Sequence, residues 1–256
     1  MNAPLKIAVA GATGRLGVPL VSVLAERGYT VVPIARATGV DVITGAGLAA
    51  ALEGVDVVVD AATGPSPEQQ AATEFFTTAA RNLQTVAAAA GVQQMIVVSI
   101  IGTDRFTAGY GAAKIAHEQA TLAGPVPARV VRASQFHEFV GQLLDWGTRD
   151  GVGHVADMRT QLVAARAVAE AIADLVTEIP ATTMVEVAGP REERLADAAR
   201  LLAQRRGHPA RVEEGLDPSD PDAELGATGA LLPGPHAIRC GPTFAEWLDA
   251  NVDVPA

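Results

Sequence analysis

A tyrosine and a lysine stand four residues apart in the segment YGAAK, as Tyr110 and Lys114. In a helix this spacing places both side chains on one face, with the ammonium beside the phenol. The positive charge lowers the pKa of the phenol, which can then donate a proton to the alkoxide formed when a carbonyl is reduced. Ser99 ends a preceding apolar run and can hydrogen-bond the same oxygen. The three residues predict a catalytic set for carbonyl reduction, although Y-x-x-x-K also arises by chance.

Reduction needs a hydride donor, and a glycine-rich segment near the N-terminus is suited to binding one. The sequence GATGRLG places Gly11, Gly14 and Gly17 between the buried apolar run 6–10 and a helical pattern. These glycines allow a tight turn, close approach of a pyrophosphate to the backbone, and close packing of helix on strand. The start of the helix also favours negative charge. The segment therefore predicts a dinucleotide-binding loop, the alternative being a loop that only turns the chain.

The end of the second predicted strand bears on which dinucleotide binds. Sites selective for NAD usually place a carboxylate there, whereas this chain has Ala35 followed by Arg36. A guanidinium at this point, with Arg15 as a second cation, suits the 2′-phosphate of NADP(H). We therefore expect NADP(H) to be preferred, with NAD(H) possible. The alternative is that the arginines are solvated surface residues.

Two further features complete the predicted cofactor site. Ala61, Ala62 and Thr63 follow the third strand, and their small side chains let a cofactor lie close to the sheet edge. They are equally compatible with close helix packing. Lys114 can hold a hydroxyl of the nicotinamide ribose while it tunes Tyr110. These positions therefore place cofactor and catalytic set at one edge of a sheet.

The elements that must position these residues alternate along the first half of the chain. Apolar runs predict buried strands, and stretches with helical periodicity that stop at glycines predict helices. The strands are expected at 6–10, 30–35, 55–59, 95–99 and 128–132, and the helices at 18–27, 48–52, 68–90 and 111–123. Repeated β-α units predict an α/β fold with a Rossmann-type, doubly wound parallel sheet. Ligands of such sheets bind beyond the carboxyl ends of the strands.

The alternation loosens after residue 134, where we expect a small C-terminal substrate cap. Helices are expected at 163–176 and 191–206, and short strands at 184–187 and 210–213. The segment 217–235 is rich in Pro, Gly and Asp and predicts a lid, and the acidic run 213–224 predicts a solvated lid surface. Without a low-complexity linker, residues 1–256 are expected to form a single domain with cap elements mainly within 134–256.

The segment after the fifth strand supplies candidate substrate contacts. Gln135, Phe136 and His137 follow this strand and therefore face the cofactor edge. The imidazole can orient or protonate a substrate, or it can simply be a helix-start residue bonded to backbone. Trp146 shares a helical face with Phe139 and either walls an apolar pocket or packs in the core.

Composition excludes several classes of function. The chain has 256 residues, a net charge of −10 and a pI near 4.9, which argues against a nucleic-acid partner. The lone Cys240 excludes an internal disulfide, and scattered histidines predict no metal site. Neither a secretory signal nor a run of the ~20 apolar residues that a membrane span needs is visible. We expect a cytoplasmic monomer or homodimer that acts on a small molecule.

Several segments together resemble a known family. GATGRLG, ARNLQTVAAAAGVQQMIVVSI, YGAAK, RASQFHEF and the C-terminal LLPGP and PTFAEWL are similar to atypical short-chain dehydrogenases/reductases, in particular the NmrA-like NAD(P)H-binding branch. The resemblance implies a Rossmann fold and a Ser/Tyr/Lys set at Ser99, Tyr110 and Lys114. Asn82 matches a helix asparagine of extended members and is expected to tie neighbouring backbone together. The resemblance also implies NADP(H) bound at Gly11, Thr13, Gly14, Arg15, Leu16 and Arg36.

The sequence leaves three functions open. The leading interpretation is an NADPH-dependent reductase that transfers hydride to a small or medium carbonyl, quinone or conjugated acceptor, with Tyr110 as general acid. The alternatives are a non-catalytic NADP(H)-binding redox sensor of the NmrA type and a dinucleotide-dependent epimerase or isomerase. Eleven positions separate Ser99 from Tyr110, fewer than is usual in the superfamily, which leaves open whether Ser99 reaches the substrate oxygen.

Overall fold

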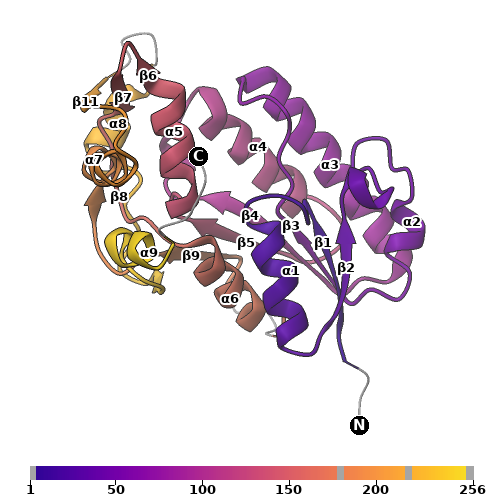
Figure 1. Ribbon diagram of the computed structural model, residues 1–256. Coiled ribbons are helices and arrows are strands. Elements are labelled where there is room, and N and C mark those ends of the chain that lie inside the picture. The colour runs from indigo at the N-terminus through magenta and orange to yellow at the C-terminus, as the bar shows by residue number, and fades with distance from the viewer. Residues whose placement is uncertain (1–3, 178–181, 217–220, 252–256) are drawn as a thin grey trace. The chain divides into compact units, whose positions relative to one another are not determined.

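The computed structural model describes residues 4–177, 182–216 and 221–251 (Figure 1). The first half contains β1 (Lys6–Ala10), α1 (Gly17–Glu26), β2 (Thr30–Ile34), η1 (Arg36–Thr38), α2 (Leu48–Ala51), β3 (Val57–Asp60), α3 (Gln69–Ala90), β4 (Gln94–Ile100), η2 (Thr103–Arg105), α4 (Gly109–Leu122) and β5 (Ala128–Ala133). The second half contains α5 (His137–Gly147), β6 (Thr148–Arg149), β7 (Val152–Ala156), β8 (Arg159–Thr160), α6 (Ala165–Leu175), β9 (Met184–Ala188), β10 (Glu193–Arg194), α7 (Leu195–Arg206), β11 (Arg211–Gly215), α8 (Ala223–Ala227), β12 (Ile238–Arg239) and α9 (Phe244–Ala250).

The central sheet confirms the predicted α/β, Rossmann-like fold. Its seven strands follow the order β12-β9-β5-β4-β3-β1-β2. The ladders of β1 with β2, β1 with β3, and β3 with β4 are parallel, and the strand order reverses direction at β1. Such a reversal opens a crevice beyond the carboxyl ends of the strands, which is where ligands of this fold class bind.

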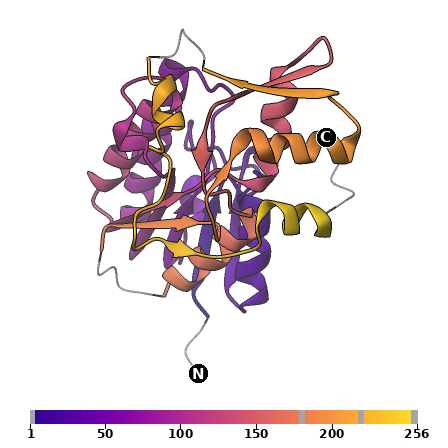
Figure 2. The ribbon, with the colours of Figure 1, turned by 90° about the vertical axis from the view of Figure 1, so that its left-hand side faces the viewer.

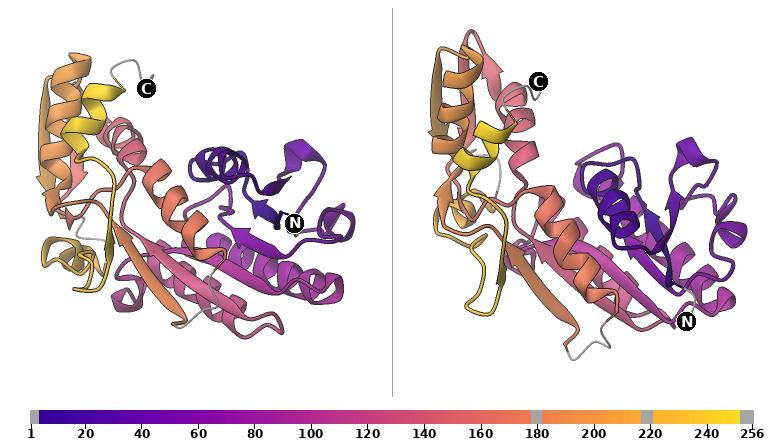
Figure 3. Two further views of the ribbon diagram at one scale, coloured as in Figure 1. Left: turned by 90° about the horizontal axis from the view of Figure 1, so that it is seen from below. Right: turned by 60° about the horizontal axis from the view of Figure 1, so that its bottom comes forward.

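The sequence explains why these strands and helices form. β1 and β3 are almost entirely buried, as apolar strands covered on both faces must be. α3 begins at Glu68, whose carboxylate accepts hydrogen bonds from two backbone N–H groups, and ends at Gly91, which has a positive φ of 77°. Its buried face carries small residues and Phe76, which lets α4 pack closely against it. Figure 3 shows α3 and α4 on one face of the sheet and α1 on the other.

The chain divides into two compact units, which we describe separately. Unit 1 comprises residues 1–99, 109–132 and 169–185, and unit 2 comprises 100–108, 133–168 and 186–256. Unit 1 contains β1 to β3, most of β4 and β5, and the helices α1 to α4. Within it, the Arg27 guanidinium pairs with the carboxylate of Asp174 and donates to the carbonyl of Glu170, which ties α1 to α6.

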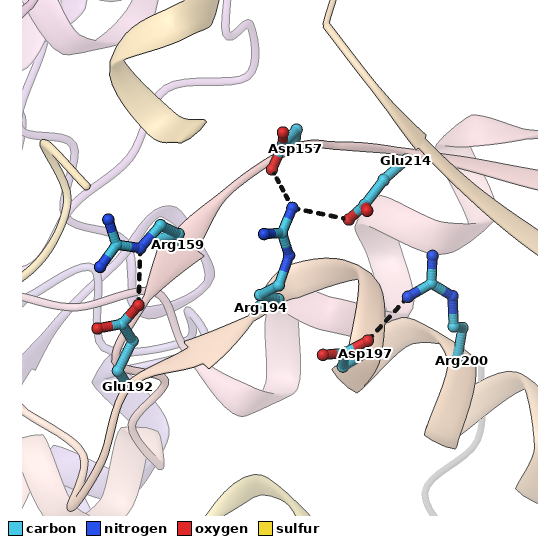
Figure 4. A network of polar contacts seen from close by, with 7 residues as sticks. All are labelled: Asp157, Arg159, Glu192, Arg194, Asp197, Arg200 and Glu214. Carbon is cyan, nitrogen blue, oxygen red and sulfur yellow. Dashed lines mark hydrogen bonds and ion pairs between the residues drawn. The ribbon is translucent and has the colours of Figure 1, made fainter. Parts of the chain in front are cut away.

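Unit 2 is built on a second, smaller sheet. Its three strands follow the order β11-β7-β6, and α7 lies along β7 and β11 (Figure 2). Ion pairs join neighbouring segments of this unit: Arg194 bonds Asp157 at 2.6 Å and Glu214 at 3.3 Å, and Arg159 bonds Glu192 at 2.7 Å (Figure 4). Because these side chains are substantially exposed, the pairs add little stability, typically below about 1 kcal/mol each.

The C-terminal half differs from expectation in its details. The structure adds α5, α8, α9, the five-residue strand β7 and several two-residue strands to the predicted elements. Residues 217–220 of the predicted lid lie outside the described residues. The acidic run is not uniformly solvated, because Asp222 is buried and its carboxylate accepts from the backbone N–H groups of Thr107 and Ala108. None of the helices in the described ranges is long and apolar enough to cross a membrane.

Candidate functional site

A cavity of about 420 Å³ lies at the carboxyl ends of β1, β2 and β3 in unit 1. This volume is in the range of small-molecule and cofactor sites. The residues lining the cavity are Gly11, Thr13, Gly14, Ile34, Ala35, Arg36, Val40, Asp41, Val42, Ile43, Ala61, Ala62, Thr63, Pro65 and Phe75. The cavity therefore occupies the place where the sheet order reverses, as expected for a ligand site of this fold.

The three glycines of the loop have separate steric roles. A Cβ on Gly17 would lie 2.0 Å from the carbonyl oxygen of Gly11, so only glycine lets α1 begin against the turn. Gly11 has a φ of 76°, and a Cβ there would lie 2.7 Å from the carbonyl oxygen of Ala61. A Cβ on Gly14 would meet only the Gly11 oxygen, at 3.1 Å, and Gly14 lines the cavity. The loop therefore packs tightly against neighbouring backbone at Gly11 and Gly17 and is open towards the cavity at Gly14, as a loop that binds a pyrophosphate requires.

Most predicted cofactor residues line this cavity. Those that do are Gly11, Thr13, Gly14, Arg36, Ala61, Ala62 and Thr63. Among the predicted residues that the structure describes, Arg15, Leu16 and Gly17 are not part of the lining. Leu16 is buried and immediately precedes α1, where its side chain contributes to the core.

The chain after β2 adds lining residues that the sequence analysis missed. Asp41 Oδ1 accepts a hydrogen bond of 2.7 Å from the backbone N–H of Ile43, which folds the segment 41–43 into a turn at the cavity wall. Asn82 of α3 secures this turn, since its Nδ2 donates to the carbonyls of Val42 and Ile43 at 2.9 and 2.8 Å. The prediction that Asn82 ties neighbouring backbone together is confirmed.

Lys114 lies in a buried polar network. Its ammonium Nζ donates to the carbonyl of Val98 at 2.7 Å and lies 2.9 Å from Nδ1 of His117. The other imidazole nitrogen, Nε2, lies 2.9 Å from Oδ2 of Asp60, the last residue of β3. All three side chains are almost completely buried. Neither Asp60 nor His117 was among the predicted site residues. The one indication in the sequence is that Asp60 is a polar residue at the end of an otherwise apolar strand.

Phe76 of α3 joins this network to Tyr110. The Lys114 Nζ lies 4.3 Å from the centroid of the Phe76 ring, and the His117 ring stacks on it at 4.6 Å. Tyr110 meets the same ring edge to face, with centroids 5.7 Å apart. The helix α4 thus brings Tyr110, Lys114 and His117 against one aromatic side chain, which the spacing of YGAAK alone did not indicate.

The electrostatics differ from the sequence-based expectation at Tyr110. Burial raises the pKa of the phenol above its ordinary value, so the expected lowering by Lys114 is not met. Burial also lowers the pKa of Lys114 to about 8, against the opposing influence of the Asp60 and Glu118 carboxylates. Ser99 is buried in β4, and among the described residues its Oγ has no hydrogen-bond partner. Its predicted contact with a substrate oxygen stays a prediction.

The predicted substrate residues lie in unit 2 and mostly have structural partners. Gln135 Oε1 accepts from Thr160 Oγ1 at 2.5 Å, and Phe136 precedes α5. His137 is buried, and its Nε2 donates to the carbonyl of Pro242 at 3.1 Å, which is the backbone-bonded alternative.

Two further predictions concern the position of Trp146 and the absence of a metal site. Trp146 is 59% exposed and meets Phe139 edge to face, so the alternative that it packs in the core is wrong. In the described ranges, no group of three or more His, Cys, Asp or Glu side chains is placed to hold a metal ion.

Solved structures with the same fold span nearly the whole chain. The dTDP-4-dehydrorhamnose reductase of Bacillus anthracis, in complex with NADP, is 15% identical, with a TM-score of 0.71 over 96% of this chain and 98% of that chain. A UDP-galactose 4-epimerase is 21% identical, with a TM-score of 0.69 over 97% and 98% of the two chains. The UDP-N-acetylglucosamine 4-epimerase of Bacillus cereus is 17% identical, with a TM-score of 0.69 over 98% and 99%. At these identities the likeness shows the fold alone.

The sequence comparisons are more limited. No curated protein gives a significant match to the chain. The NmrA-like branch that the motifs resemble stays a prediction. A family model matches part of the chain. Residues 7–133, which hold the glycine loop, the Ala61–Thr63 segment and YGAAK, match the NAD dependent epimerase/dehydratase family.

Proposed function

We propose that the protein is an NADPH-dependent reductase that transfers a hydride to a small or medium carbonyl, quinone or conjugated acceptor. The observation that carries the proposal is the cavity at the reversal of the sheet, which the glycine loop and Arg36 both line. The shape of the glycine loop fits a dinucleotide, because there is no room for a Cβ at Gly11 or Gly17 while Gly14 faces the cavity. The matching family and the solved neighbours support a nicotinamide dinucleotide as the cofactor.

The preference for NADPH rests on Arg36. This residue stands two positions after the end of β2 and lines the cavity, near the position where NAD-selective sites carry a carboxylate. Asp41 also lines the cavity, but its Oδ1 already accepts hydrogen bonds from Ile43 and Thr44, which directs this carboxylate oxygen towards its own loop. The guanidinium therefore supplies a suitable partner for a 2′-phosphate.

The chemical step assigns distinct roles to the residues of α4. Bound NADPH supplies the hydride. Tyr110 donates its phenolic proton to the developing alkoxide, and the Lys114 ammonium stabilises the tyrosinate that this transfer leaves behind. Ser99 donates a hydrogen bond to the substrate oxygen from the end of β4. Burial raises the pKa of Tyr110, so the phenol is protonated at neutral pH, the form that a proton donor needs. The same rise makes it a weaker acid, which the Lys114 charge must offset by stabilising the tyrosinate.

The test is oxidation of NADPH, followed at 340 nm across a panel of ketones, aldehydes, quinones and conjugated carbonyls. We expect turnover with at least one class, and a fall in kcat of roughly 100-fold or more in Tyr110→Phe. This variant keeps the ring that contacts Phe76, so binding of NADPH should be unchanged. Tight binding of NADPH without turnover of any acceptor would favour a sensor, whereas turnover unaffected by Tyr110→Phe would refute the assigned acid.

An epimerase is the second candidate, because the family match and two of the structural neighbours include epimerases. Such an enzyme removes and returns a hydride on one substrate and therefore consumes no external NADPH. Incubation with UDP-sugars, with the products separated by chromatography, distinguishes the two functions. Interconversion of stereoisomers without net NADPH oxidation would replace the reductase assignment.

A further inference from the structure

The buried chain Asp60–His117–Lys114 connects the cofactor cavity to the catalytic helix. Asp60 ends β3, and its Oδ1 accepts a hydrogen bond of 3.0 Å from the backbone N–H of Ala62, which lines the cavity. Its other oxygen, Oδ2, meets Nε2 of His117 on α4. The carboxylate therefore fixes both the backbone beside the cofactor site and the orientation of an imidazole beside Lys114.

The partners of His117 determine its tautomer. An ionised carboxylate only accepts hydrogen bonds, so Nε2 must carry the proton that it donates to Asp60. An ammonium only donates, so Nδ1 must present its lone pair to Lys114 Nζ. His117 is therefore neutral, which agrees with the lowering of its pKa by burial and by the charge of Lys114, against the opposing effect of Asp60.

The surroundings leave this arrangement little freedom. Phe76 stacks on the imidazole and lies under the ammonium, and the Val98 carbonyl accepts a second hydrogen bond from Nζ. The other charged groups near Lys114 are Asp60, from β3, and Glu118, from α4. Glu118 is itself paired with Arg132 of β5 through two hydrogen bonds of 3.0 and 2.8 Å. Two of the three ammonium protons are thus engaged in hydrogen bonds, and the Phe76 ring covers the same ammonium.

We propose that Asp60 and His117 are positioning residues for Lys114: Asp60 fixes the tautomer of His117, whose Nδ1 lone pair holds the ammonium against the Phe76 ring that Tyr110 also contacts. The inference deepens the proposed function and rests on it for its catalytic consequence. Asp60 acts through the imidazole, as a carboxylate that holds a catalytic histidine in one tautomer does.

The substitution Asp60→Asn tests the mechanism with minimal change of shape. The amide oxygen can still accept from Ala62, but the amide nitrogen donates to Nε2 and forces the proton of His117 onto Nδ1. That N–H then faces the Lys114 ammonium, and two donors oppose each other. We expect Lys114 to leave this position or lose its proton, and kcat to fall at least tenfold while the KM for NADPH changes less.

A spectroscopic measurement tests the arrangement without any turnover. The chain contains only two lysines, Lys6 and Lys114, so selective labelling of lysine side chains gives two signals, which Lys6→Arg assigns. Labelled histidines report the tautomer directly, and His117→Asn identifies its signal among the five. We expect an Nε2–H tautomer for His117 in the wild-type protein and the Nδ1–H form in Asp60→Asn. A wild-type His117 that is protonated on Nδ1, alone or on both nitrogens, at neutral pH would overturn the proposal.

A double-mutant cycle separates positioning from a general loss of structure. In His117→Asn the amide oxygen replaces Nδ1 as an acceptor, and no tautomer remains for Asp60 to set. If Asp60 acts through His117, adding Asp60→Asn to His117→Asn lowers kcat by less than twofold. An equal loss in both backgrounds would overturn the proposal.

In Asp60→Asn we also expect the alkaline limb of the kcat profile to move to lower pH, because the charge of Asp60 raises the pKa of Lys114. A protein that shows the predicted tautomers but turns over no substrate would refute the proposed function and leave the geometry standing.

Discussion

The imidazole of His117 lies nearly parallel to the ring of Phe76, with the two centroids 4.6 Å apart and the planes inclined by 15°. The same ring meets Tyr110 on its edge and lies below the Lys114 ammonium. One aromatic side chain of α3 therefore sets the relative positions of three side chains of α4. Its neighbour Phe75 lines the cofactor cavity instead. The two adjacent phenylalanines should have separable effects.

Phe76→Leu should lower kcat by roughly tenfold or more, because a small displacement of catalytic groups is costly. The KM for NADPH should change little. Phe75→Leu is the matched control, with the opposite expectation: a weaker cofactor complex and a nearly unchanged kcat. Steady-state kinetics with saturating acceptor checks both variants. The same pattern of kcat and KM in the two variants would contradict the division of roles.

Arg36→Asp should weaken the binding of NADPH by roughly 10- to 100-fold, the loss expected for a charge-assisted hydrogen bond. NADH binding should change little or improve, since a carboxylate there can accept from a ribose hydroxyl. Fluorescence titration with both cofactors measures the ratio. The exposed Arg81 of α3 provides a control of equal charge change in Arg81→Asp. An equal loss for NADPH and NADH would remove the assignment of the 2′-phosphate to Arg36.

Gly17→Ala should destabilise the protein by about 3 kcal/mol, as overpacking at a rigid backbone contact does. The added Cβ would lie 2.0 Å from the Gly11 carbonyl oxygen, so the glycine loop must move and cofactor binding should be lost with it. Gly215→Ala is the control, because a Cβ there meets nothing within 4 Å. Urea denaturation and NADPH titration check the result, and a Gly17→Ala protein of normal stability and affinity would contradict the packing described here.

His137 should make stability depend on pH. Burial lowers the pKa of its imidazole from 6.5 to about 4, against the opposing bond to Pro242. Between these two pH values the unfolded chain binds a proton that the folded chain does not, so stability falls as the pH falls from 6.5 to 4, by about 3 kcal/mol in total. Urea denaturation followed by the fluorescence of Trp247, in a Trp146→Phe background, measures it. His137→Phe should flatten this part of the profile; an unchanged slope would assign the dependence to other groups.

Much of the first half of the fold could be predicted from the sequence. Buried runs such as KIAVA form strands whether or not the partner is known, since both faces are covered, and Gly28 and Gly91 end their helices by adopting positive φ. The second half could not be predicted in the same detail. Two-residue strands such as β8 and β10 contain too few residues to show periodicity, and their pairing depends on contacts between distant segments.

The candidate site, too, could be predicted from the sequence only in part. Glycine spacing and Arg36 indicated the cavity because these residues act through the local backbone and charge. The partners of Lys114 come from β4, from α4 and from a ring of α3, a set that only the tertiary structure brings together. The expected lowering of the Tyr110 pKa rested on the charge of Lys114, whereas burial raises this pKa.

The most direct test of the account is the fate of the cofactor's hydrogen. NADPH deuterated at C4 of the nicotinamide is incubated with the protein and the best acceptor of the panel whose reduction forms a C–H bond that does not exchange with water, such as a ketone or aldehyde, and the product is analysed by mass spectrometry. With deuterium on one face of the nicotinamide C4, the account predicts a product one mass unit heavier. With deuterium on the other face, it predicts an unlabelled product. In Tyr110→Phe it predicts a large loss of product. Product without deuterium from either labelled cofactor, or bound NADPH that is never oxidised, would contradict it.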